Sequence, residues 1–71
     1  MRYLIIIEKA EHNYGAYCPD LPGCVSTGKT IEETIKNMQE SIEFHLDGIR
    51  EDGEPIPAPT ATDAWVEVSV A

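Results

Sequence analysis

The sequence has few basic residues, with 5 lysines and arginines against 13 aspartates and glutamates and a formal net charge of −8. Direct binding to nucleic acid is therefore not expected, because its affinity depends on lysine and arginine neutralising phosphates. A basic protein would suit such a chain as a partner, since complementary charge speeds encounter and disfavours wrong partners. Acidity also keeps a small protein soluble, so both interpretations of the charge stay open.

Cysteine and histidine are scarce as well, with two of each. A structural zinc site needs four clustered ligands, and His12 and His45 lie far in the sequence from Cys18 and Cys24. We therefore expect neither a metal nor another cofactor.

Long hydrophobic runs are missing. The aliphatic run that begins at Leu4 in "MRYLIII" is too short for a secretory signal or a membrane-spanning helix. The sequence thus predicts a cytoplasmic protein without membrane contact, in which cysteines normally stay reduced.

The chain has 71 residues, which predicts one domain over residues 1–71 with a small core. Small domains usually gain stability from disulfides, a metal or a partner subunit. Because the first two are not expected, the length favours self-association.

Four segments have the patterns of strands. Residues 3–7 form an apolar run, "YGAYCPD" follows after the turn signal "HNYG", and "GCVSTG" reads as a third, short strand. At the end of the sequence "WVEVSV" alternates, with Val66, Val68 and Val70 pointing one way. The proline-rich stretch between residues 53 and 64 is predicted to be an extended connector.

One helix is predicted between Thr30 and Gly53. Thr30 and Glu33 form a capping-box pattern, and Gly53 is placed to end the helix. The spacing of the apolar residues predicts a single core-facing stripe, made of Ile31, Ile35, Met38, Ile42, Leu46 and Ile49.

These elements predict an α+β fold of order β-β-β-α-β, a small antiparallel-rich sheet with one helix on one face. The first strand is apolar on both faces, so the face without the helix needs another cover. We expect a second copy of the chain to provide it.

Between residues 3 and 60 several ordered motifs resemble the HicB-like antitoxin family. They are carried by "YGAYCPDLPGCVSTGKTIEETIKNMQESIEFHL" and the following "EDGEPIPAP". The resemblance implies a partial ribonuclease H-like fold, a dimer or tetramer, and the binding and blocking of HicA, a small basic mRNA interferase. Full-length family members add a DNA-binding segment, whereas we expect no C-terminal DNA-binding domain here.

The turn "PDLPGC" is interpreted as structural, with prolines that restrict φ, an aspartate that bonds its own backbone and a glycine at positive φ. Cys24 is expected to be a small buried residue. Cys18 could face it across a hairpin, so a disulfide stays possible, whereas a nucleophilic role lacks a nearby base. The motif comprises Pro19, Asp20, Leu21, Pro22, Gly23 and Cys24.

The chain is not expected to be an enzyme. A ribonuclease H-like nuclease needs several carboxylates gathered around two metal ions. Glu8, Asp20 and Glu67 are associated with the strands but need not converge, and His45 is better explained by packing than by catalysis.

Two functions remain as hypotheses, an antitoxin that neutralises a HicA-like toxin and an orphan oligomeric module with a structural or regulatory role. The residues predicted to bind a toxin lie on the exposed helix face and are Glu40, Glu43, Phe44 and Asp47. The residues predicted for self-association are Tyr3, Ile5, Ile7 and Trp65.

Overall fold

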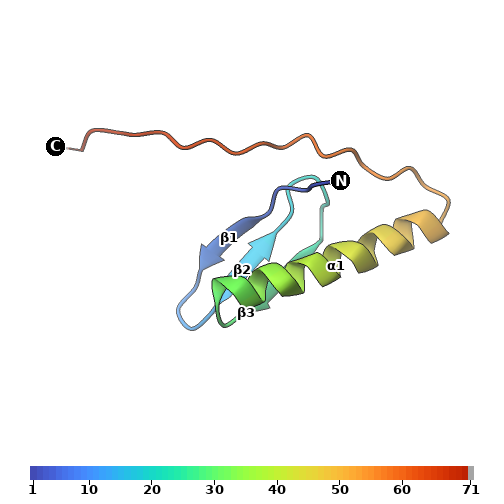
Figure 1. Ribbon diagram of the computed structural model, residues 1–71, viewed down its shortest axis with the longest axis horizontal. Helices are drawn as coiled ribbons and strands as arrows, with labels where there is room; N and C mark the ends of the chain where they lie inside the picture. Colours follow the sequence, from blue (N-terminus) through green and yellow to red (C-terminus); the bar gives the residue numbers. More distant parts are fainter. Residues whose placement is uncertain (71) are drawn as a thin grey trace.

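The computed structural model describes residues 1–70 and contains three strands followed by one helix (Figure 1). The strands are β1 (Ile6–Lys9), β2 (Tyr14–Tyr17) and β3 (Val25–Gly28), and the helix is α1 (Ile31–Glu51). The predicted β-β-β-α order and α+β class are confirmed. No helix in the described residues is long and apolar enough to cross a membrane.

The sheet is antiparallel in the order β1-β2-β3, which follows from two short hairpin connections. Ile7 pairs with Ala16 and Ala16 with Ser26, while Ile6 pairs with Tyr17 and Tyr17 with Val25. Because side chains alternate along a strand, these two rows lie on opposite faces. Ala16 is buried and Ile7 packs against the core, whereas Tyr17 and Val25 are 43% and 64% exposed.

Both ends of α1 have capping interactions that the sequence predicts. At its start the Thr30 hydroxyl accepts a hydrogen bond from the Glu33 N–H at 3.0 Å. The Glu33 carboxylate accepts in turn from the N–H of Lys29, one residue before the N-cap. At its end Gly53 has φ +72°, and the N–H groups of Gly53 and Glu54 bond the carbonyls of Arg50 and Ile49. This is the Schellman arrangement, in which glycine takes the left-handed position.

The helix covers one face of the sheet and packs on β3 and β2 (Figure 1). Its most buried residues are Thr34 and Met38, each 0% exposed. The predicted stripe is therefore only partly right, because Ile31 and Ile35 are 45% and 47% exposed. The helix is rotated so that Thr34, and not Ile35, faces the sheet.

A close approach between β3 and α1 explains this rotation. A Cβ atom on Gly28 would lie 2.7 Å from the Thr34 nitrogen and 2.9 Å from its Cα atom. Thr34 in turn donates its hydroxyl proton to the Thr30 carbonyl at 2.7 Å, so its polar atom is satisfied in the core. Only glycine at position 28 lets the first helical turn lie this close to the strand.

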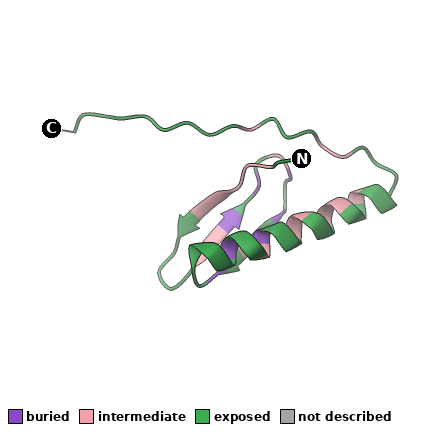
Figure 2. Ribbon diagram, in the orientation of Figure 1, coloured by how far each residue is buried: buried purple, intermediate pink, exposed green. Residues whose placement is uncertain are grey.

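The segment after the helix is extended and mostly exposed (Figure 2). Residues 53–70, here called the tail, run back along the molecule past the N-terminus (Figure 1). The radius of gyration is 14.3 Å, against about 11 Å for a compact domain of this length. The tail accounts for this excess.

The fourth strand predicted at residues 65–70 is not formed in the single chain. Val66, Val68 and Val70 are 80%, 75% and 87% exposed, and the sheet of the described residues has three strands. The alternating pattern is that of a strand, but a strand forms only where a neighbouring backbone is available to pair with it.

We expect Gly28→Ala to lower the free energy of unfolding by about 1–3 kcal/mol, because the added methyl group overpacks a backbone contact. Urea denaturation followed by circular dichroism measures this change. Gly15→Ala is the matched control, since no atom lies within 4 Å of its added Cβ. Equal stability of both variants would contradict the close packing of Gly28 on Thr34.

Candidate partner-binding surface

The outer face of α1 carries the residues predicted to contact a toxin. Glu40, Glu43, Phe44 and Asp47 are all exposed, and Phe44 is 82% exposed. Their spacing of three and four residues places them side by side on the helix surface. Asp47 lies 3.7 Å from Arg50, an exposed ion pair that contributes little to stability.

This surface combines negative charge with one large aromatic side chain. Aromatic residues are common at the centres of protein interfaces, and charged residues at their rims. The helix also carries two basic residues near this surface, Lys36 one turn before Glu40 and Arg50 beside Asp47. The arrangement suits a basic protein surface that has an apolar depression.

The "PDLPGC" motif forms two successive turns. The Leu21 N–H bonds the Cys18 carbonyl at 3.1 Å, and the Cys24 N–H bonds the Leu21 carbonyl at 3.1 Å. In the second turn Pro22 precedes Gly23, whose φ is +84°; this is the sequence preference of a type II turn. Between the two turns Leu21 is 1% exposed, so the loop inserts an apolar side chain into the core.

Asp20 has a role that the sequence did not predict. Instead of bonding its own backbone, its carboxylate accepts three hydrogen bonds from the tail. The donors are the N–H and hydroxyl groups of Thr60, at 3.0 and 2.7 Å, and the N–H of Ala61 at 3.0 Å. These hydrogen bonds, from Ala61 first and then Thr60, hold the pKa of Asp20 below its ordinary value.

A second contact joins the tail to the start of the chain, where the Tyr3 hydroxyl donates to the Pro57 carbonyl. Asp20 and Tyr3 thus tie the first part of the tail to the domain. Local sequence patterns give no signal for either contact, because the partners are separated by 40 and 54 residues.

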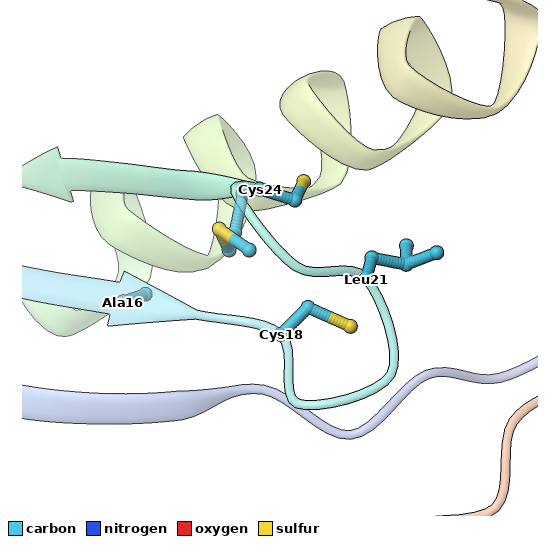
Figure 3. Packing of buried hydrophobic residues seen from close by; sticks show 5 residues of the cluster. Ala16, Cys18, Leu21 and Cys24 are labelled. Atoms are coloured by element: carbon cyan, nitrogen blue, oxygen red, sulfur yellow. The ribbon is translucent and has the colours of Figure 1, made fainter. Parts of the chain in front are cut away.

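The two cysteines are free and buried on the sides of the double turn (Figure 3). Cys18 is 3% and Cys24 4% exposed, which confirms the prediction that Cys24 is a small core residue. Burial, together with the neighbouring Cys18 thiol, raises the pKa of the Cys24 thiol. A thiol of this kind carries little thiolate at neutral pH and is a poor nucleophile.

The residues predicted for self-association do not share one surface. Tyr3, Ile5 and Ile7 pack against the core cluster on the helix side of the sheet. Trp65 lies on the tail and is 94% exposed. The face of the sheet away from the helix presents Ile6, Tyr17 and Val25 instead. The assignment of an interface remains a prediction.

The carboxylates considered for nuclease chemistry are not brought together. Glu8 is exposed on β1, Asp20 is engaged with the tail, and Glu67 is exposed. Among residues 1–70, no group of three or more histidine, cysteine, aspartate or glutamate residues is placed to hold a metal ion.

The chain belongs to the HicB-like antitoxin family. The profile described as "HicB_like antitoxin of bacterial toxin-antitoxin system" matches residues 3–69. "Antitoxin HicB 2" of Photorhabdus laumondii is 35% identical over 69 residues, which is 96% of this chain and 50% of that protein. An uncharacterised 14.9 kDa protein of Haemophilus phage HP1 is 39% identical over 93% of this chain and 50% of its own length. The chain therefore spans about half the length of these two relatives.

Solved structures show the same fold. The N-terminal domain of the Burkholderia pseudomallei antitoxin HicB has a TM-score of 0.74 and 35% identity, covering 86% of this chain and 73% of that one. A chain from the structure described as "HicA3 and HicB3 toxin-antitoxin complex" has a TM-score of 0.72 and 32% identity, covering 84% and 70%. The resemblance in the sequence is thus confirmed.

We expect acid to release the tail from Asp20. The hydrogen bonds of Asp20 with Thr60 and Ala61, here called the clamp, lower the pKa of Asp20 in the folded protein. The clamp therefore stabilises the folded arrangement above the unfolded pKa, about 3.9, and this stabilisation is lost as the pH falls through the folded pKa. Amide exchange at Thr60 and Ala61, read by NMR, measures this release. Asp20→Ala should raise both exchange rates at neutral pH, whereas Asp63→Ala, which removes an exposed acid of the same tail, should not. Unchanged exchange in Asp20→Ala would contradict the clamp.

The thiols should react slowly in the native protein. We expect alkylation by iodoacetamide at neutral pH to be at least about tenfold slower than in urea, because access and thiolate fraction are both low. Mass spectrometry of the time course measures it. Native rates close to those in urea would contradict the burial of Cys18 and Cys24.

Proposed function

We propose that this chain acts as an antitoxin that binds a small basic HicA-like toxin and blocks its active surface without catalysis of its own. The observation that carries the proposal is its similarity, at 32% identity and a TM-score of 0.72, to a chain from a HicA3 and HicB3 complex. The net charge of −8 adds electrostatic complementarity to a basic toxin.

The outer face of α1 is the surface that we assign to the toxin. Phe44 is exposed and makes no contribution to the core, so its apolar area becomes useful only when a partner covers it. Glu40, Glu43 and Asp47 surround it and would meet lysine or arginine side chains. Such rim charges mainly raise the association rate and make binding sensitive to salt.

The remaining parts of the proposal follow from the same role. A toxin that cuts mRNA is met in the cytoplasm, and an acidic antitoxin needs no direct contact with nucleic acid. Self-association of the chain stays a prediction.

The first experiment is a native pull-down with the tagged chain from its own host, followed by mass spectrometry. We expect a small basic protein that is released by high salt, and co-expression of the chain should restore growth when that protein is induced. Recovery of the chain alone, without any growth rescue, would refute the antitoxin role and favour the orphan oligomeric module.

Charge reversal on the helix tests the surface. We expect Glu40→Lys with Glu43→Lys to weaken binding of the recovered toxin at least about tenfold, mainly through slower association. Surface plasmon resonance at several salt concentrations measures both rates. The matched control is Glu11→Lys with Glu54→Lys, which changes the net charge equally but lies outside the helix. An equal loss in both variants would show a general effect of charge and not a binding surface on α1.

A further inference from the structure

The two cysteines lie opposite each other at the ends of two neighbouring strands. Cys18 directly follows β2 and Cys24 directly precedes β3 (Figure 3). The register that pairs Tyr17 with Val25 places Cys18 opposite Cys24 one step further along. The Cys18 N–H donates to the Cys24 carbonyl at 3.3 Å, so the antiparallel ladder continues into this pair.

Both cysteine side chains lie on the same face of the sheet. Ala16 pairs with Ser26, and the two cysteines stand two positions beyond this pair on their strands. Because side chains alternate along a strand, Cys18 and Cys24 share the face of Ala16, and all three belong to the same buried cluster. Burial, and after it the neighbouring Cys18 thiol, raises the pKa of Cys24, which agrees with two thiols that lie close together.

The backbone at this pair meets a main geometric requirement of a disulfide. Opposite residues that share a backbone hydrogen bond have Cα atoms about 5.5 Å apart, and disulfides usually join Cα atoms about 4.4–6.8 Å apart. Both thiols are free. A bond between them therefore needs new side-chain rotamers and only a small adjustment of the strand ends.

We propose that Cys18 and Cys24 form a reversible disulfide when a small-molecule disulfide such as oxidised glutathione is present. One cysteine thiolate attacks the glutathione disulfide and releases one reduced glutathione. The second thiolate then attacks the protein sulfur of the mixed disulfide and releases another. The two cysteines together lose two protons and two electrons, which the two released glutathione molecules carry away.

The bond acts on the loop that holds the tail. Residues 18–24 form the double turn, and the hydrogen bond between its ends is 3.3 Å long, beyond the usual range of about 2.7–3.2 Å. Asp20 lies inside this loop and accepts three hydrogen bonds from Thr60 and Ala61. A covalent link between the ends of the loop restricts its motion and therefore holds the Asp20 carboxylate more firmly against the tail.

The reaction is slow, although its equilibrium favours the disulfide. Both thiols are buried, so an oxidant reaches them only when the loop opens, and the same burial makes alkylation slow. The fold nevertheless keeps the two thiols next to each other, which raises their effective concentration above that in the unfolded chain. Low reactivity towards iodoacetamide and oxidation at equilibrium are therefore compatible.

Equilibration in glutathione buffers tests the bond. The chain is incubated, native and in urea, at fixed reduced and increasing oxidised glutathione, starting from both the reduced and the oxidised form, and its mass is measured after an acid quench. We expect the native chain to lose two hydrogens at a concentration of oxidised glutathione at least about tenfold lower than the unfolded chain requires. A native chain that needs as much as the unfolded chain or more, or that links to a second chain instead, would overturn the proposal.

The single variants Cys18→Ala and Cys24→Ala are the controls, because each removes one partner of the bond without adding charge. Neither should lose two hydrogens in any buffer, and circular dichroism checks that each is folded. Loss of two hydrogens in either variant would show that the mass change has another origin, which overturns the assignment to this pair.

Amide exchange measures the effect on the tail. In the wild-type chain we expect exchange at Thr60 and Ala61 to be at least about twofold slower in the oxidised form, and reduction by dithiothreitol should restore the original rates. Equal or faster exchange after oxidation would overturn the link between the disulfide and the tail. None of these outcomes depends on a toxin, so the antitoxin role is tested separately.

Discussion

The close approach of Gly28 to Thr34 determines how the helix sits on the sheet. Since no side chain separates β3 from the first helical turn, Thr34 and Met38 become the residues that face the strands. The direction in which the other side chains of the helix point follows from this rotation. Phe44 and the neighbouring acids turn to solvent, and Ile35 turns to the flank beside β1.

The helix thus has three faces with different uses. One is buried on β2 and β3, one carries charge and an aromatic residue, and one leaves an apolar flank open. An amphipathic pattern alone does not separate the first face from the third, because both are apolar. Which of the two is buried depends on where β2 and β3 lie against the helix.

The local elements could be predicted from the sequence because their causes are local. The capping of Thr30, the turn at Pro22 and Gly23 and the end of the helix at Gly53 each depend on residues within a few positions. The rotation of the helix could not be predicted, since it depends on a contact between different elements. Nor could the partners of Asp20, which lie 40 and 41 residues away.

The fourth strand shows the same limit in another form. An alternating pattern indicates that a segment is suited to a sheet, but it does not indicate which strand will be its neighbour. Val66, Val68 and Val70 have the pattern of a strand, whereas the predicted pairing of this segment with the sheet is wrong for the single chain. Pairing depends on where a neighbouring backbone lies, and the alternation within one segment does not contain this information.

The clamp at Asp20 also divides the chain into a part that is attached to the domain and a part that is not. Up to Ala61 the backbone is attached to the domain by hydrogen bonds, while residues 62–70 are extended and exposed. Exposed, extended termini are the segments that proteases cut most readily. The clamp therefore marks the point at which trimming of an unpaired chain would stop, leaving the sheet, the double turn and the helix as a resistant fragment.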